Sequence, residues 1–357
     1  MTSSEQLFIE LIQVSLGNRK LLSRNPSAEE WKAMSDIAKN QAVAGVTFDA
    51  LDGLSQKEQK IPITLLFEWI GLAEQIKNQN HIVNQRCAEV TRMFSNAGWK
   101  ICILKGQGNA LMYPNPLFRM PGDIDIWVDA PKEDIVKYIW GQFPNAKVSE
   151  HHVEYPIFDD VDVEAHFRPA SAVSMSYDKR LDSFLLGQKD SQFRHRVSLP
   201  DTEGVVNVPT VEFNVIYQMA HMMKHFFSEG LGMRHLMDYY YVLMSDESQK
   251  ERDYTRALQE LGMLKFAKAV MWVLGNVFLL DRNRMVCEPD EKRGKLLLQE
   301  IMAGGNFGHS DERFAKRLMS KSSTLSILVR NAKLFWLFPE EAIMAPVSNV
   351  IRRLKNG

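Results

Sequence analysis

The chain has 357 residues with 43 basic and 44 acidic side chains, so its formal net charge is −1. Hydrophobic residues make up 45% and charged residues 24% of the sequence, which is typical of a soluble globular protein with one large or two modest domains. A net charge near zero gives no general attraction to nucleic acid, so the sequence carries no strong nucleic-acid signal.

The cysteines and the apolar runs bear on the cellular compartment in which the protein is expected. Cys87, Cys102 and Cys287 are far apart and form no Cys-x-x-Cys pair, which favours a reducing environment and argues against a structural zinc site. The N-terminus shows no basic segment followed by an apolar stretch, and no apolar run is long enough to span a bilayer. We therefore expect a cytoplasmic protein with no membrane partner.

The first region, residues 1–98, is predicted to be helical. Ser27 is followed three residues later by Glu30, the spacing of a capping box at a helix start. A longer helix is predicted over residues 63–94, where apolar side chains recur at helical spacing. Gly98 ends this helix just before the first predicted strand, and we expect the region to pack on a sheet as a helical cap.

Residues 99–209 are predicted to form an α/β core whose first strand is the apolar run 101–104. Lys105 and Gly106 follow in a glycine-rich turn. Such a turn lets backbone N–H groups approach phosphate oxygens, and the lysine adds a positive charge, so we interpret both residues as phosphate-binding. A strand-ending surface lysine is the alternative. The turn lacks the Walker A pattern, which argues against a P-loop ATPase.

The second strand is predicted at residues 123–128, which read Asp-Ile-Asp-Ile-Trp-Val. Strand side chains alternate between faces, so Asp123 and Asp125 point the same way. Two adjacent carboxylates repel each other, and a divalent metal is the most economical positive charge to place between them. Arg119 precedes Asp123 by four residues and is a candidate partner for a catalytic carboxylate or a phosphate, with a plain surface arginine as the alternative.

A further alternating run, residues 161–167, places Asp162, Glu164 and His166 on one face. If this strand lies beside the preceding one, a third carboxylate joins the pair. Three carboxylates on neighbouring strands suit two Mg²⁺ or Mn²⁺ ions that hold a nucleoside triphosphate and activate a hydroxyl. Taken alone, each run is also explained by an edge strand with a solvated acidic face.

Together these motifs resemble a known family. Leu-Lys-Gly, then Arg-x-x-Gly-Asp-Ile-Asp-Ile-Trp-Val, then Val-Glu-Ala-His-Phe is similar to the bacterial uncharacterised nucleotidyltransferases (type 5 nucleotidyltransferase domain) of the DNA polymerase beta-type superfamily. The turn at residues 105–108 departs from the Gly-Gly or Gly-Ser that is usual there. The resemblance implies that Asp123, Asp125 and Glu164 are the catalytic metal ligands, because its pattern has the third acid two residues before a histidine.

The rest of the core is less regular. A helix is predicted from residue 131 to 143, a strand within 148–158, and a loop or hairpin over 170–209 that includes a short strand at 205–208. The predicted fold class is α+β, with a small mixed β-sheet nucleotidyltransferase core flanked by N-terminal and C-terminal helical regions.

The C-terminal region, residues 210–357, is predicted to be helical, with Thr210 capping its first helix. His221 and His225 lie four residues apart on one helix face. Their spacing resembles a zinc motif, but Met222 stands where His-Glu-x-x-His requires glutamate. We interpret both histidines as lining the nucleotide or acceptor pocket, and buried core histidines are the alternative.

This region also contains an Arg–Asp pair, a glycine-rich segment and several further predicted helices. Arg234 and Asp238 have the spacing of a salt bridge within one helix. The family resemblance, which has a similar basic-then-acidic helix here, leaves a pocket role open for both. The glycine-rich segment 304–309 is interpreted as a helix-ending turn rather than a nucleotide-binding loop. Further helices are predicted at residues 251–280, 291–303, 311–337 and 340–354.

The sequence therefore predicts a metal-dependent, ATP-binding type of nucleotidyltransferase that moves an NMP from an NTP to a hydroxyl and releases pyrophosphate. The acceptor is left open among a small molecule, a protein and an RNA end. Two alternatives remain: a catalytically silent nucleotide-binding or interaction module, and a toxin-like nucleotidyltransferase with an antitoxin partner.

Overall fold

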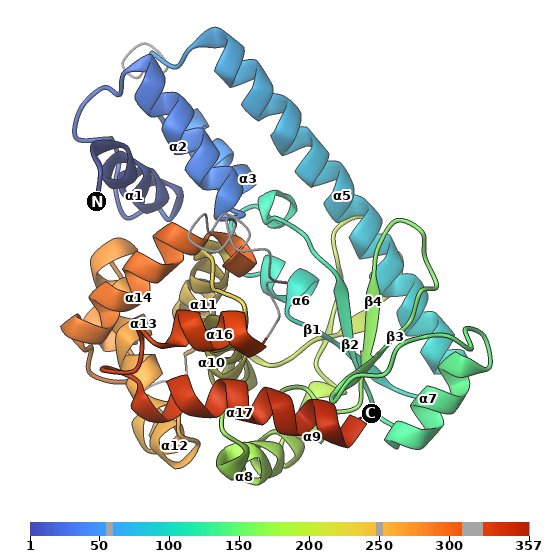
Figure 1. Cartoon of the computed structure of the whole chain (residues 1–357). Coiled ribbons are helices and arrows are strands. Elements are labelled where there is room, and N and C mark those ends of the chain that lie inside the picture. Colours follow the sequence, from blue (N-terminus) through green and yellow to red (C-terminus); the bar gives the residue numbers. More distant parts are fainter. Residues whose placement is uncertain (55–59, 248–252, 309–323, 357) are drawn as a thin grey trace.

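A four-stranded sheet with helices on both faces forms the centre of the computed structural model, which describes residues 1–54, 60–247, 253–308 and 324–356 (Figure 1). Its strands are β1 (Ile101–Leu104), β2 (Ile124–Val128), β3 (His152–Glu154) and β4 (Val163–His166). The spatial order is β1-β2-β4-β3. β2 runs parallel to β4, and both outer strands are antiparallel to their neighbours. The predicted α+β class with a small mixed sheet is confirmed.

The N-terminal helices begin where the sequence places them. The capping box is present: the Ser27 side chain accepts from the Glu30 N–H, and the Glu30 carboxylate accepts from the Ser27 N–H. The long helix α5 then runs along one side of the molecule to Gly98, whose φ of +85° suits a residue without a Cβ. The elements are α1 (Ser3–Ser15), α2 (Ala28–Asn40), α3 (Ala44–Asp49), η1 (Ala50–Gly53) and α5 (Ile63–Asn96).

The sheet separates two apolar clusters because its strands alternate. Ile124, Ile126 and Val128 face a cluster formed with the second half of α5 and with α7 (Lys132–Trp140). Trp127 faces the other way, into a larger cluster that contains both N-terminal and C-terminal helices. The polar members of this second face, Asp125 among them, are therefore directed toward the C-terminal helices.

The segment 170–209 corrects the prediction of a loop or hairpin. It contains helices α8 (Met175–Leu186) and α9 (Lys189–Gln192), and only then a hairpin of β5 (Arg196–Val197) and β6 (Val206–Asn207). The polar, Ser-rich composition conceals α8, because only Leu181 and Leu185 of this helix are buried. The structure places no strand over most of residues 148–158 either: β3 covers three of them, and Val148 adds an isolated bridge to Val153.

The C-terminal region is helical, as predicted. Thr210 caps α10, since its side chain accepts from the Phe213 N–H. The single helix predicted over 251–280 is two helices in the described part, α12 and α13, because Gly262 with a φ of +72° ends the first. The predicted helix 311–337 falls partly outside the described residues. The elements are α10 (Val211–Ser228), α11 (Met233–Ser245), α12 (Tyr254–Glu260), α13 (Leu264–Val277), η4 (Arg282–Arg284), α14 (Glu291–Gly304), η5 (Asn306–Gly308), α16 (Thr324–Asn331) and α17 (Pro339–Asn356).

The two helical regions meet each other directly. Gln13 of α1 donates to the Val277 carbonyl of α13, and Asn18 donates to the Phe278 carbonyl. Their apolar residues share the larger cluster, while the boundaries at residues 98 and 209 stay a prediction. None of the described helices is both long and apolar enough to cross a membrane.

Candidate active site

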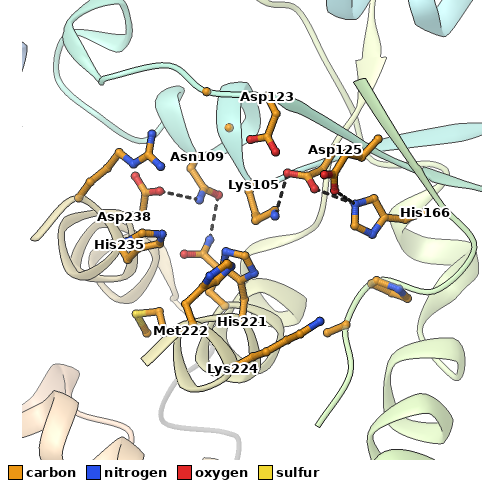
Figure 2. A pocket seen from close by; sticks show the side chains of 18 of the residues that line it. Lys105, Asn109, Asp123, Asp125, His166, His221, Met222, Lys224, His235 and Asp238 are labelled. Carbon is orange, nitrogen blue, oxygen red and sulfur yellow. Dashed lines mark hydrogen bonds and ion pairs between the residues drawn. The ribbon is translucent and has the colours of Figure 1, made fainter. Parts of the chain in front are cut away.

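A cavity of about 560 Å³ lies between the polar face of the sheet and helices α10 and α11. Its size falls within the range of pockets that hold small-molecule ligands, about 300–1,000 Å³. All eight residues named above as site candidates line it: Lys105, Gly106, Arg119, Asp123, Asp125, Glu164, His221 and His225. Residues from three separate parts of the sequence therefore converge on one space, as Figure 2 shows.

The sheet side of the cavity carries two facing carboxylates. Asp125 and Glu164 are register partners on the parallel strands β2 and β4, so their side chains leave the sheet on the same face. Asp125 is buried, at 4% exposure, and Glu164 is half-buried. Asp162 is exposed and does not line the cavity. The geometry therefore favours Glu164 as the third site carboxylate.

Asp123 lies just before β2, at the exposed edge of the same cavity. Repulsion by Asp125, and then burial, raise the pKa of Asp123 above its ordinary value. Asp123 does not belong to the group of potential metal ligands formed by Asp125, Glu164 and His166, whose ligand atoms lie within 4.8 Å of one another. The two aspartates thus share a face, as alternation predicts, but they differ in environment.

Lys105 supplies positive charge to this group. Its Nζ lies 2.8 Å from Asp125 Oδ2, an ion pair drawn in Figure 2. Lys105 follows β1 with a φ of +53° and precedes Gly106 with a φ of +36°. The chain therefore leaves the strand through two residues with positive φ, of which only the glycine adopts that conformation without strain. Burial opposes the charge on Lys105, but Asp125 outweighs it and raises the pKa of the lysine. The predicted phosphate-binding lysine is therefore held beside the carboxylates.

His166 bridges the two facing carboxylates. Its Nε2 lies 2.7 Å from Asp125 Oδ1 and 3.3 Å from Glu164 Oε2. Burial alone would raise the pKa of Asp125, but Lys105 and the hydrogen bond from His166 lower it below its usual value. Burial would also raise the pKa of Glu164, and hydrogen bonds from His152 and His166 outweigh it, so that pKa is held well below its usual range. Both carboxylates are consequently ionised at neutral pH.

Arg119 has a different partner from the one predicted. Its Nε and Nη2 donate to Asp238 Oδ1 and Oδ2 at 2.8 and 2.7 Å, and both side chains are buried. Tyr113 donates to the same carboxylate at 2.6 Å. This bidentate pair ties the segment before β2 to α11 and leaves Arg119 as a wall of the cavity rather than a partner of Asp123 or Asp125.

The predicted helix salt bridge between Arg234 and Asp238 is wrong for the same reason, since Asp238 is directed toward Arg119. Arg234 Nη1 instead reaches the carbonyls of Met120 and Pro121, at 3.3 Å each. Burial, and the nearby positive charge of Arg119, lower the pKa of Arg234. Arg234 lines the cavity on the Asp123 side, the pocket position that the family resemblance left open for it.

The helical wall of the cavity carries the predicted histidines with a lysine between them. His221 and His225 have ring centroids 4.3 Å apart, and His235 of α11 lies 6.0 and 5.8 Å from them. Lys224 lies between them in the sequence and also lines the cavity, where burial lowers its pKa to about 8 (Figure 2). His221 and His225 both line the cavity, the position that their interpretation as pocket residues requires.

Several cavity residues escaped the sequence prediction. His151 and His152 form a doublet inside the predicted strand 148–158, and the doublet is their only local signal. Phe307 belongs to the glycine-rich segment that was predicted to be a helix-ending turn. That prediction holds for the backbone, since Gly305 ends α14 with a φ of +65°, but the turn also delivers an aromatic side chain 5.0 Å from the ring of His225.

The donor set fits a divalent cation. Mg²⁺ binds oxygen ligands and is usually held by one or two carboxylates together with substrate phosphates. Here the carboxylates of Asp123, Asp125 and Glu164 line one cavity, and their mutual repulsion is strong enough to raise the pKa of Asp123. Added positive charge at this place would relieve that repulsion, so the residues suit the ion that the sequence motifs imply.

Comparisons with known proteins identify the family. The model of a family described as uncharacterised nucleotidyltransferase matches residues 27–278, and the chain belongs to this family. Among solved structures, the chain is similar to an antigenic nucleotidyltransferase-like protein from Paracoccidioides brasiliensis, with 15% sequence identity, a TM-score of 0.34, and coverage of 58% of this chain and 93% of that one. A comparison with curated proteins gives no match.

Proposed function

We propose that the protein is a metal-dependent nucleotidyltransferase that transfers an NMP from an NTP to a hydroxyl acceptor. The observation that carries this proposal is the pair Asp125 and Glu164, which face each other from adjacent parallel strands in the floor of a ligand-sized cavity. Membership of the nucleotidyltransferase family supports the reaction class. In the proposed reaction the acceptor hydroxyl loses its proton to solvent, its oxygen forms a bond to the α-phosphorus, the α–β phosphoanhydride bond breaks, and pyrophosphate leaves.

Asp123, Asp125 and Glu164 would hold Mg²⁺ or Mn²⁺, which supplies neutralisation of the phosphate charge and lowers the pKa of a bound hydroxyl. Glu164 acts as a charged ligand rather than a proton acceptor, because its pKa is held well below its usual range. Lys105 lies at the turn after β1, where its ammonium group can pair with the phosphate oxygens of the leaving pyrophosphate. Arg234, on the Asp123 side of the cavity, is a second cation available to phosphate oxygens.

The helical wall is proposed to orient the substrates. His221 and Lys224 project from α10 into the cavity that the carboxylates also line (Figure 2). His225 lines the same cavity, so a molecule that fills it contacts both walls. A lysine whose pKa is lowered by burial gains from an anionic group placed beside it. These residues do not distinguish between acceptors, so a small molecule, a protein and an RNA end remain candidates.

One observation favours a catalytically silent module as the second candidate. Both oxygens of Asp125 have partners within the protein, Lys105 on Oδ2 and His166 on Oδ1. If these bonds persist when nucleotide binds, the metal site is never completed. The toxin-like alternative with an antitoxin partner differs from the proposed enzyme only in its acceptor and its regulation. A single assay of nucleotidyl transfer therefore tests the chemistry of both.

The test is a turnover screen of the purified full chain. Each of the four NTPs, labelled at the α-phosphate, is incubated with Mg²⁺ or Mn²⁺ and pools of hydroxyl-bearing small molecules, proteins and RNA, while pyrophosphate release is followed. The proposal expects label transfer with matching pyrophosphate release, lost in Asp125→Asn and kept in the control Asp162→Asn. Nucleotide binding without pyrophosphate release in any pool would support the silent module instead.

A further inference from the structure

Three histidines form a cluster beside the carboxylates. The proposed reaction assigns no role to this cluster. His151, His152 and His166 have ligand atoms within 4.8 Å of one another, and all three line the cavity. His152 and His166 are direct partners on the antiparallel strands β3 and β4, which places their side chains on one face. His151 precedes β3, and the turn formed by Ser149 and His152 brings its ring to the same side.

The distances between the rings match a tetrahedral metal centre. Zn²⁺ bonds imidazole nitrogens at about 2.0–2.1 Å, which places the centroids of three tetrahedrally arranged rings about 5 Å apart. The observed centroid separations are 4.8 Å for His151–His152, 5.2 Å for His151–His166 and 5.1 Å for His152–His166. No pair departs from the expected separation by more than a few tenths of an ångström.

The hydrogen bonds leave a suitable nitrogen on each ring. The Nε2 atom of His166 faces two carboxylates, which only accept, so this atom carries the proton and Nδ1 is the free position. Nδ1 of His166 and Nδ1 of His151 are buried and have no hydrogen-bond partner among the described residues. Nδ1 of His152 also lacks a hydrogen-bond partner in the described part of the chain, but it lies 3.0 Å from Glu164 Oε2 as an ion-pair contact, which leaves Nε2 of this ring for a metal. Buried polar atoms without partners are costly, and a metal ion would satisfy them.

We propose that His151, His152 and His166 form a second metal site, which takes a transition-metal ion of the Zn²⁺ class and is distinct from the carboxylate site for Mg²⁺. Imidazole ligands select Zn²⁺ and its neighbours, whereas Mg²⁺ prefers oxygen. The bond from His166 to Asp125 then has the arrangement in which a metal-bound histidine donates its other N–H to a carboxylate. An ion held by the three histidines would position Asp125 and Glu164 through His166 and His152.

The test uses the full chain, stripped of metal with EDTA and titrated with Co²⁺ as a spectroscopic substitute for Zn²⁺. We expect one Co²⁺ per chain with the strong visible absorption of a tetrahedral site, not displaced by a large excess of Mg²⁺. His151→Gln and His152→Gln should each weaken binding at least tenfold. Both positions are half-buried, and circular dichroism of the stripped variants checks that they fold.

Two matched controls separate this site from its neighbours. His225→Gln alters the other histidine group in the cavity and should leave Co²⁺ binding unchanged, as should Asp123→Asn. Asp123→Asn also tests the histidine site independently of the proposed function. This variant should remove nucleotidyl transfer and leave the three histidines unchanged. Failure of wild type to bind Co²⁺, displacement by Mg²⁺, or a loss in His225→Gln equal to that in His151→Gln would overturn the proposal.

Discussion

Asp125 on β2 and Glu164 on β4 lie directly opposite each other in a parallel pair of strands, and both face the same cavity. The two residues are 39 positions apart in sequence, and α7 and β3 lie between them along the chain. Because β2 and β4 are adjacent, the two carboxylates form one site with Asp123, and each can be removed separately.

Asp123→Asn and Asp125→Asn should have opposite effects on stability. Asp125 is buried between Lys105 and His166, so its loss leaves the Lys105 ammonium and the His166 N–H without a carboxylate and should cost about 3–5 kcal/mol in the free energy of unfolding. Asp123 has a raised pKa because Asp125 repels it, and its neutralisation should leave stability unchanged or slightly increased. Urea unfolding of both variants in EDTA measures the difference. Equal destabilisation would show that the two aspartates do not occupy the different environments described here.

Glu164→Gln should reduce turnover far more than Asp162→Asn. Glu164 faces Asp125 in the cavity, and loss of a metal-binding carboxylate should lower kcat on the order of 10²-fold or more. Asp162 is exposed outside the cavity, so its amide variant is a matched control from the same strand segment. Steady-state kinetics with the NTP identified by the screen gives the ranking. A reversed order would mean that the site uses the neighbouring position on this strand.

The free energy of unfolding of the metal-free protein should depend on pH through His166. Burial lowers the pKa of His166, but its bonds to Asp125 and Glu164 outweigh burial and raise it above the unfolded value of about 6.5. The resulting stabilisation is fully present below the unfolded pKa and is lost as the pH rises through the folded pKa. Urea unfolding in EDTA between about pH 6 and pH 9 should therefore show a decline that is reduced in His166→Gln. A wild-type curve parallel to that of the variant would contradict the bridging role.

The Arg119–Asp238 pair should be structural rather than catalytic. Asp238→Asn leaves the buried guanidinium of Arg119 without its charge partner and should cost about 3–5 kcal/mol of unfolding free energy. The double variant Arg119→Met with Asp238→Asn removes the unpaired charge as well and should recover part of that loss. Urea unfolding of the single and double variants tests this. A stable Asp238→Asn protein that has lost turnover would instead assign Asp238 a direct role in the reaction.

Local patterns in the sequence were sufficient for much of the sheet. The alternation in residues 161–167 correctly predicted that Glu164 and His166 share a face, because strand periodicity is a property of the backbone alone. Asp162, predicted on the same face, precedes β4 and lies outside the cavity. The capping signals at Ser27 and Thr210 were equally local and are confirmed. Helix α8 was missed because a half-exposed helix in a polar segment leaves few apolar positions from which to detect a period.

Partners that are distant in sequence could not be predicted. Asp238 has a nearby arginine at the ideal helical spacing, Arg234, yet it pairs with Arg119, 119 positions away. The i, i+4 rule describes an isolated helix, whereas here the packing of α11 against the segment before β2 directs the carboxylate inward. The triangle of His151, His152 and His166 is hidden for the same reason, since it depends on the pairing of β3 with β4.

The central claim, a nucleotide site completed by a divalent metal on Asp123, Asp125 and Glu164, is tested most directly by calorimetric titration of an NTP into the full chain. The measurement needs no acceptor. We expect binding at least tenfold tighter with Mg²⁺ than with EDTA, because the carboxylates repel a bare triphosphate and the metal joins the two. The difference should disappear in Asp125→Asn and persist in Asp162→Asn. Equal affinity of the wild-type protein with Mg²⁺ and with EDTA would contradict the account.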